Sequence, residues 1–271
     1  MNWLYVKSLL IRTPLEEPAQ RLRDFTGILR RLRYPELHDI YMEQNRIDQA
    51  MRKIIQSDVN CIDIGCHIGS SLSLMLRLSP RGRHIAFEPV QEKAEWLRRK
   101  FPEVEIMALA LGDKRERRAF FQDASHPGFS GFASHPGFSG SAKHSATRDE
   151  VIEQTVDCET LDNVVGADRK YTFVKIDVEG AELSVLKGAR QLIARDTPII
   201  LFESSHDGAM RLGFKRDDLF TFFVDELGYK VFLVKDFLEK RAALDLTGFQ
   251  RAAVYPFQAF NFLAIPNAIT H

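Results

Sequence analysis

The sequence has 271 residues, of which 45% are hydrophobic and 27% charged, and these numbers suit a soluble globular protein with one large α/β domain, or one domain with a modest extension. Lysine and arginine together number 37, as do aspartate and glutamate, so the zero net charge provides no overall positive field for nucleic acid or an anionic membrane. No stretch approaches the roughly 20 apolar residues of a membrane-spanning helix. We therefore expect neither a nucleic-acid partner nor a membrane span.

The three cysteines, Cys61, Cys66 and Cys158, are odd in number and widely scattered. This pattern argues against a disulfide framework and against structural zinc, and it predicts a reducing compartment, hence a cytoplasmic location. The N-terminal stretch "MNWLYVKSLLIRTPLEEP" lacks the continuous apolar core of a signal peptide because Lys7 and Arg12 interrupt it. It predicts an ordinary packing helix or, alternatively, an amphipathic helix that touches a membrane surface or a partner.

Residues 1–56 are predicted to form a helical cap. The stretches "PAQRLRDFTGILRRLRY" and "ELHDIYMEQNRIDQAMRKII" place apolar residues at helical spacing with charged residues between them. No glycine-rich linker separates them from the strand that begins near residue 60. We therefore expect the cap to pack on a main domain that spans residues 57–271.

From residue 60 onward, predicted strands alternate with predicted helices. Strands are predicted at residues 60–65, 83–89, 104–111, 171–177, 197–204, 229–236 and 259–266. Helices are predicted at residues 70–78, 90–101, 181–194 and 215–228. This alternation indicates βαβ units, so we expect an α/β, Rossmann-like fold with a mostly parallel sheet of about seven strands and helices on both faces.

A short repeat interrupts this alternation. The segment "SHPGFSGFASHPGFSG" contains SHPGFSG twice, beginning at Ser125 and at Ser134. Its glycine, proline and serine residues predict a loop rather than a strand or helix over residues 124–148. We interpret it either as a tolerated surface insertion or as a flexible lid over the site.

The first predicted strand ends in the turn "GCHIG". Gly65 and Gly69 would let the backbone approach a ligand, and the amides at the start of the next helix can bind a negative group. A dinucleotide fingerprint would have a glycine where His67 stands, so a pyrophosphate would be crowded and a small carboxylate would fit better. Glu88 ends the second strand, where an acidic side chain can accept hydrogen bonds from both ribose hydroxyls. The pattern therefore predicts a nucleoside with a small charged tail, such as S-adenosylmethionine.

Six segments resemble successive motifs of the FkbM-family S-adenosylmethionine-dependent methyltransferases, and together they extend from residue 60 to residue 266. They are "CIDIGCHIGS", "IAFEPV", "ALALGD", "FVKIDVEGAELSVLKGA", "IILFES" and "NFLAIP". The most specific part is "KIDVEGAE". The resemblance implies a class I methyltransferase fold over residues 57–271, S-adenosylmethionine as the cofactor, and methyl transfer as the reaction.

The resemblance also implies which residues bind the cofactor. They are Asp63, Gly65 and Gly69 in the turn, Cys66, His67 and Ser70 lining or bordering it, Glu88 with Pro89 at the ribose, Ala110 and Leu111 flanking the adenine, and Asp177 at the methionine end. The first acid after the third strand is Asp113, so backbone and apolar contacts are expected to recognise the adenine. The duplicated loop leaves open whether Ser130 or Ser139 matches the family's single loop motif.

Acidic and basic side chains gather at the ends of two later strands. Strand alternation places Lys175, Asp177 and Glu179 on one side, while Glu203 ends the next strand and His206 follows it. Asp177, His206 or Lys175 could accept the proton of an acceptor hydroxyl. Alternatively, the charged group is a salt-bridged strand end and His206 an exposed loop residue. Asp177 and Glu179 show no obvious third ligand for a divalent metal, so no metal site is predicted.

We therefore expect O-methylation of a hydroxyl on a sugar, a glycan or a natural-product acceptor. Acceptor selection would reside in the N-terminal helices and in residues 124–148. The alternatives are a non-catalytic binding protein on a methyltransferase fold and a nicotinamide-dependent oxidoreductase, whose pyrophosphate-binding glycines are missing here. A nucleic-acid methyltransferase is disfavoured because the chain is neutral and lacks an NPPY-like or a catalytic Cys-Pro motif.

Overall fold

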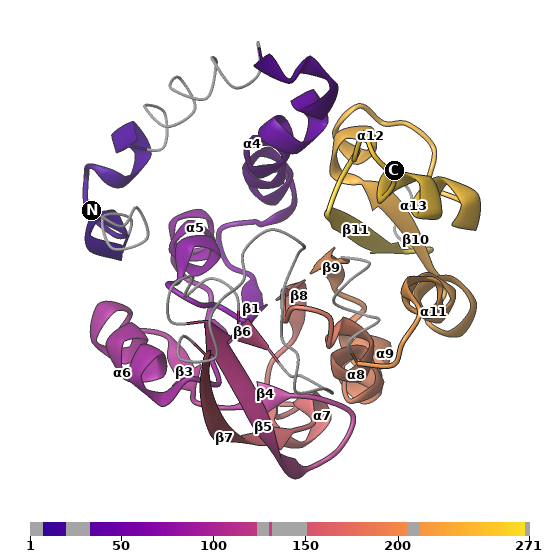
Figure 1. Ribbon diagram of the computed structural model, residues 1–271. Coiled ribbons are helices and arrows are strands. Elements are labelled where there is room, and N and C mark those ends of the chain that lie inside the picture. The colour runs from indigo at the N-terminus through magenta and orange to yellow at the C-terminus, as the bar shows by residue number, and fades with distance from the viewer. Residues whose placement is uncertain (1–7, 20–32, 124–129, 132–150, 205–211, 269–271) are drawn as a thin grey trace.

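The computed structural model describes residues 8–19, 33–123, 130–131, 151–204 and 212–268. Its centre is a seven-stranded sheet in the order β10-β11-β9-β8-β1-β2-β3 (Figure 1). The strands are β1 (Asn60–Ile64), β2 (Ile85–Phe87), β3 (Glu105–Met107), β8 (Tyr171–Ile176), β9 (Ile199–Glu203), β10 (Tyr229–Leu233) and β11 (Asn261–Pro266). Within this sheet β11 alone runs in the direction opposite to the other six strands. The predicted mostly parallel sheet of about seven strands is confirmed.

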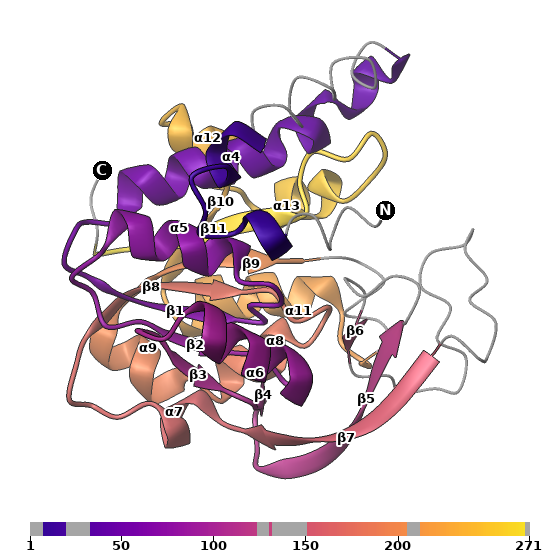
Figure 2. The ribbon, with the colours of Figure 1, turned by 90° about the vertical axis from the view of Figure 1, so that its left-hand side faces the viewer.

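Helices cover both faces of this sheet, as predicted (Figure 2). One face packs against α4 (His38–Ile54), α5 (Ser70–Leu78), α6 (Gln91–Lys100) and α12 (Val234–Leu238). The other packs against α7 (Leu161–Val164), α8 (Glu182–Lys187), α9 (Arg190–Asp196), α11 (Arg216–Thr221) and α13 (Leu246–Ala252). Each face encloses its own apolar cluster. Because both faces are covered, a central strand such as β8 is buried along nearly its whole length rather than at alternate residues.

The order of the strands creates a switch point between β1 and β8. From β1 the chain continues to β2 and β3 on one side, whereas β8 and β9 lie on the other. Asp63 pairs with Lys175, and Ile64 pairs with Ile176, so the two strands end side by side. In open parallel sheets, the crevice beyond the strand ends at such a point is where ligands bind.

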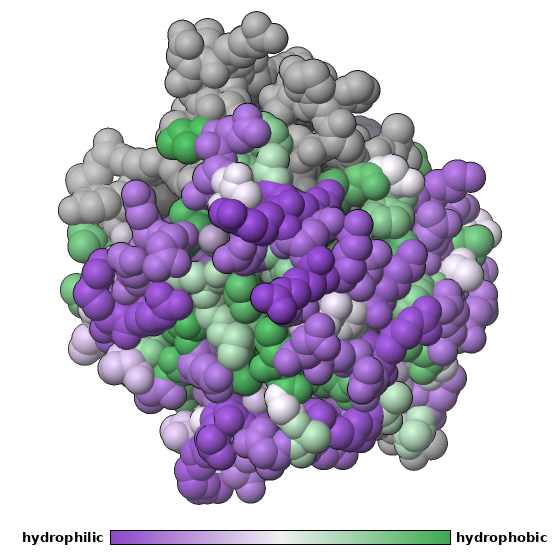
Figure 3. Space-filling model, turned by 90° about the horizontal axis from the view of Figure 1, so that it is seen from below, coloured by the Kyte–Doolittle hydropathy of each residue, from purple (hydrophilic) through white to green (hydrophobic). Residues whose placement is uncertain are grey.

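A second, smaller sheet was not predicted. It has the order β4-β7-β5-β6 and comprises β4 (Ala110–Leu111), β5 (Glu116–Asp123), β6 (Ser130–Gly131) and β7 (Val151–Glu159). It lies at the bottom of Figure 1, and the face seen from below has an apolar hollow near its middle that hydrophilic side chains surround (Figure 3). The prediction of one strand over residues 104–111 was wrong, because β3 ends at Met107 and β4 pairs with β7 instead.

The prediction that residues 124–148 contain no strand was wrong at one point. Ser130 and Gly131 pair with Gln122 and Phe121 of β5, since the chain turns back along the edge of the hairpin. The rest of that segment lies outside the described residues. The proposed lid, Ser139 and most of the duplicated repeat therefore stay predictions.

Two predicted helices differ from the observed ones. The helix predicted at residues 181–194 is divided into α8 and α9. The carbonyl of Gly188 accepts a hydrogen bond from the Asp162 amide instead of one from an amide further along a continuous helix. The helix predicted at residues 215–228 widens after α11 into a π-helical turn, η3 (Phe222–Glu226), in which the Leu227 amide donates to the Phe222 carbonyl. The strand predicted at residues 229–236 ends at Leu233, where α12 begins.

The N-terminal elements are attached to the main sheet by buried and charged contacts. Lys235 of α12 forms an ion pair with Asp39 of α4 at 2.6 Å. Glu16 is 4% exposed and accepts hydrogen bonds from Ser73 and Arg77 of α5. Among the described residues, no helix is long and apolar enough to span a membrane. The division of the chain at residue 56 stays a prediction.

Candidate functional site

The turn after β1 is shaped by two glycines that have no room for a side chain. Gly65 and Gly69 both have φ = +75°, a conformation that other residues rarely adopt. A Cβ on Gly65 would lie 1.9 Å from the carbonyl oxygen of Asp177, and one on Gly69 would lie 2.5 Å from the Phe101 ring. The glycines therefore bring the turn against the end of β8 and against α6.

Glu88 follows β2 and faces this turn. One of its carboxylate oxygens accepts the His67 amide at 3.0 Å, and the other accepts the Val90 amide at 3.1 Å. The residue is 4% exposed, and burial raises the pKa of its carboxyl. Each oxygen keeps a second acceptor position. Glu88 is thus fixed in place and can still accept hydrogen bonds from a ligand such as a ribose.

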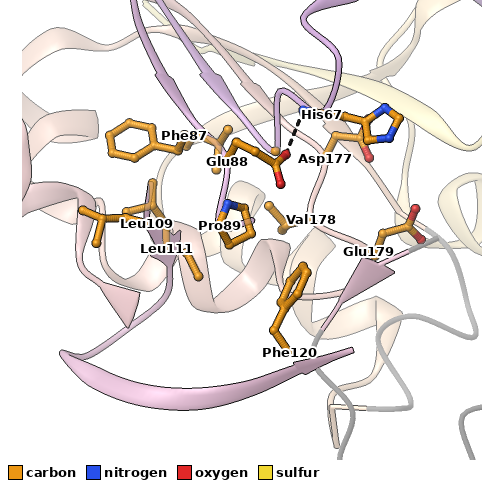
Figure 4. A pocket seen from close by; sticks show the side chains of 13 residues that line it. His67, Phe87, Glu88, Pro89, Leu109, Leu111, Phe120, Asp177, Val178 and Glu179 are labelled. Carbon is orange, nitrogen blue, oxygen red and sulfur yellow. Dashed lines mark hydrogen bonds between the residues drawn. The ribbon is translucent and has the colours of Figure 1, made fainter. Parts of the chain in front are cut away.

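A cavity opens at the switch point (Figure 4). Of the predicted cofactor residues, it is lined by Gly65, His67, Glu88, Pro89, Ala110, Leu111 and Asp177. Four others, Asp63, Cys66, Gly69 and Ser70, are not among its lining residues. Sequence reasoning missed Ile64, Phe87, Leu109, Phe120 and Val178. Ile64 and Phe87 are the last residues of their strands and could have been found from that position, whereas Phe120 belongs to the hairpin that was not predicted.

Beneath the turn, Lys175 connects two carboxylates. Its ammonium lies 3.1 Å from Asp177 and 3.5 Å from Asp63, which is completely buried. Burial alone would lower the pKa of Lys175, but the two carboxylates outweigh burial and raise that pKa. Burial also raises the pKa of the Asp63 carboxyl, although Lys175 opposes the rise. Lys175 therefore stays protonated and holds the ends of β1 and β8 together.

Three carboxylates meet at the open end of the site. Asp177, Glu179 and Glu203 each bring an oxygen within 4.8 Å of the others. The statement that Asp177 and Glu179 have no third carboxylate near them was wrong, because β9 ends beside β8 and carries Glu203. The three carboxylates could hold a metal ion. However, the Lys175 ammonium lies 3.1 Å from Asp177 and already neutralises part of their negative charge.

Asp177 and Glu203 differ in their proton affinity. Burial, together with the nearby charges of Asp177 and Glu179, raises the pKa of Glu203 well above its usual range. Burial acts in the same direction on Asp177, but Lys175 and a hydrogen bond with Glu203 outweigh it, so the pKa of Asp177 is lowered. Of the two, Glu203 therefore holds a proton more readily, and Asp177 is the more readily ionised.

The turn after β8 is held by a buried acid that sequence reasoning did not single out. One oxygen of Glu182 accepts the Val178 amide at 3.2 Å and the Gly180 amide at 3.1 Å. Glu179 between them has φ = +55°, which is unusual for a residue with a side chain. The signal for Glu182 was present in the motif "VEGAE", where an acid follows a turn glycine by two residues.

The remaining predicted site residue, His206, lies outside the described residues, so its role stays a prediction.

The three cysteines are free and buried. Burial raises the pKa of the Cys61 thiol to about 12 and that of Cys158 to about 11. Both thiols are therefore protonated and unreactive at neutral pH.

Comparison with known proteins agrees with this geometry. Residues 63–231 match the family described as the methyltransferase FkbM domain. No curated protein sequence matches the chain. Among solved structures, the FkbM methyltransferase of Methylobacillus flagellatus KT is 18% identical, with a TM-score of 0.45, over 77% of this chain and 44% of that one. This chain thus spans less than half of that relative's length.

Two further structures have similar scores. The precorrin-6y C5,15-methyltransferase of Geobacter metallireducens GS-15 is 14% identical, with a TM-score of 0.39, over 70% of this chain and 73% of that one. The SMU.1697c protein of Streptococcus mutans, in complex with SAH, is 8% identical, with a TM-score of 0.41, over 70% and 86%. Because the family match covers more than half of the sequence, this chain belongs to the FkbM family of S-adenosylmethionine-dependent methyltransferases.

Proposed function

We propose that the protein methylates a hydroxyl group, with Asp177 as the residue that accepts the hydroxyl proton. The observation that supports this role is the ion pair between Asp177 and Lys175, which keeps Asp177 ionised at the mouth of the cofactor cavity. The side chain of Asp177 is 38% exposed, so an acceptor can reach it. Glu203, whose pKa is raised, lies beside it, and in its protonated form it can donate a hydrogen bond to an acceptor oxygen.

The cofactor, when bound, supplies an electrophilic methyl group on a positively charged sulfur. The residues of this chain would then orient the acceptor oxygen toward that methyl and remove its proton. The hydroxyl proton would become strongly acidic as its oxygen accepts the methyl group from the sulfur. A carboxylate with a lowered pKa, such as Asp177, is then a sufficient base. Lys175 cannot take this role because its raised pKa keeps it protonated.

For the cofactor we propose the residues that the resemblance implied and that line the cavity. Glu88 would accept hydrogen bonds from the ribose hydroxyls, because its carboxylate is fixed by two amides and faces the cavity (Figure 4). Ala110 and Leu111 would flank the adenine, and Gly65 with His67 would border the methionine end. Asp63 would act from behind, by holding Lys175 in position.

For the acceptor we propose an uncharged molecule rich in hydroxyls, such as a sugar, a glycan or a polyol natural product. Hydroxyl groups donate to carboxylates, and Asp177 and Glu179 supply two of them in the cavity, with Glu203 beside them. The charges of Asp177 and Glu179 would repel an acceptor that carries a phosphate or a carboxylate. A nucleic-acid acceptor is disfavoured for that reason as well as by the neutral net charge.

The test is a transfer assay with labelled S-adenosylmethionine and a panel of neutral sugars and polyol acceptors. Asp177→Asn should reduce kcat by about 100-fold or more, because it removes the base, and this loss should far exceed any loss in the affinity for S-adenosylhomocysteine, whose methionine end Asp177 is expected to border. Asp168→Asn, at an exposed acid far from the cavity, is the matched control and should match the wild type. A methyl group found on nitrogen or sulfur, or full activity of Asp177→Asn, would contradict the proposal. Cofactor binding without transfer to any acceptor would instead favour a non-catalytic binding protein.

A further inference from the structure

Phe120 belongs to the second sheet, yet its ring points into the cofactor cavity (Figure 4). It lies on β5, more than 50 residues after Gly65, in the hairpin that β5 forms with β7. The residue is 6% exposed and packs in a cluster with Val90, Ala110 and Val156, against which Val178 also packs. The hairpin thus adds an aromatic wall to a site that residues of the main sheet and of β4 also line.

The direction of the ring follows from strand alternation. Phe120 is opposite Gln154 in the hairpin, and the next residue, Phe121, is opposite Glu153. Successive side chains of a strand point to opposite faces, so Phe120 faces the cavity and Phe121 faces away from it. The two phenylalanines differ in orientation while sharing the same strand and chemistry.

The cavity has an acidic end and an apolar end. Its carboxylates are Glu88, Asp177 and Glu179, whereas Phe87, Leu109 and Leu111 form an apolar wall on the far side of Pro89 (Figure 4). Asp113, the first acid after the third predicted strand, is not among the described residues that line the cavity. A planar base bound at the apolar end would therefore have to be recognised through its faces rather than through an ion pair with its amino group.

We propose that the Phe120 ring forms the face against which the adenine base of the cofactor lies. This assignment rests on the cofactor site proposed above. It follows from the apolar cluster that Phe120 shares with Ala110, which flanks the apolar end, and from the value of aromatic rings as platforms for nucleobases. The hairpin is then part of the cofactor site, and its strand β5 supplies one face of the adenine pocket.

The test compares three ligands by calorimetric titration of the full chain. S-adenosylhomocysteine and 5′-methylthioadenosine both contain adenine, whereas S-ribosylhomocysteine lacks it. Phe120→Ala should weaken the binding of the first two by about tenfold, and by equal factors, because it removes one base–aromatic contact. It should leave the affinity for S-ribosylhomocysteine unchanged. Phe120→Tyr, which keeps the ring, should bind all three as the wild type does.

Phe121→Ala is the matched control, since it removes a ring from the same strand on the opposite face, and it should leave all three affinities unchanged. Melting temperatures of each variant verify that the chain is folded. Unchanged binding of S-adenosylhomocysteine by Phe120→Ala overturns the proposal, and so does an equal loss for S-ribosylhomocysteine, which would indicate a general distortion of the site. No acceptor is used, so these outcomes are independent of whether the protein methylates a hydroxyl.

Discussion

Among single residues, Glu182 shows how a buried acid can shape a site that it does not enter. Its carboxylate holds the Val178 and Gly180 amides and so fixes the turn that carries Asp177 and Glu179. Burial raises the pKa of this carboxyl to about 7. Because the folded-state pKa lies above the usual value of about 4.3 in the unfolded chain, the group favours folding below that value, and this contribution is lost as the pH rises toward 7.

Replacing Glu182 should separate its charge from its hydrogen bonds. Glu182→Gln keeps an oxygen for the two amides but cannot ionise, so its free energy of unfolding should not fall between pH 4.5 and pH 7 as far as that of the wild type. Glu182→Ala leaves both amides unpaired and should cost about 2 kcal/mol at pH 5. Urea unfolding at pH 5 and pH 8 measures both effects. Parallel pH dependence of the wild type and Glu182→Gln would show that the carboxyl does not titrate in this range.

Among the turns that join the elements, the one after β1 packs directly on the end of β8. The sequence predicted that the glycines of "GCHIG" form a tight turn, but it could not predict what that turn packs against. We expected them to make room for a ligand, whereas at Gly65 the nearest atom is the carbonyl oxygen of Asp177. That contact joins residues more than 100 positions apart, so it depends on the pairing of β1 with β8 and is invisible to local patterns.

Gly65→Ala should therefore disrupt the contact between two elements and not just strain one turn. A Cβ placed 1.9 Å from the Asp177 oxygen must move the backbone, so we expect a loss of more than about 3 kcal/mol in the free energy of unfolding. Gly213→Ala is the control, because Gly213 also has a positive φ, +79°, but no atom of the described residues lies within 4 Å of the added Cβ. It should cost about 1 kcal/mol. Equal losses in urea unfolding would refute the packing argument.

The sequences of its strands explain why the second sheet could not be predicted. The main strands are apolar runs bounded by turn residues, and each of the seven lies within a predicted strand, although the ranges predicted at residues 104–111 and 229–236 were too long. In contrast, β5 reads "ERRAFFQD", in which four of the eight residues are charged because one face of the hairpin is open to solvent. Its partner β7 begins 28 residues after β5 ends, beyond the repeated loop. Neither periodicity nor a short turn therefore marked the hairpin, and Phe120 was missed with it.

For the whole molecule, the fold class and the position of the site followed from the order of strands and helices. The ligand site was predicted at the turn after the first strand, and the cavity lies there, at the switch point between β1 and β8. The convergence of Asp177, Glu179 and Glu203 was only half predicted. Alternation along the strand predicted that Asp177 and Glu179, which follow β8, lie on one side. The approach of Glu203 depends on β9 being the next strand in the sheet, which could not be predicted locally.

The most direct measurement is a calorimetric titration of the full chain with S-adenosylhomocysteine, with NAD as the comparison ligand. We expect micromolar binding of S-adenosylhomocysteine, none of NAD, and at least about tenfold weaker binding in Glu88→Gln, which loses a charged acceptor for the ribose hydroxyls. Glu92→Gln, at an exposed acid four residues further along the chain, should bind as the wild type does. Absence of S-adenosylhomocysteine binding, or equal affinity in Glu88→Gln and the wild type, would contradict the account of this cavity as the cofactor site.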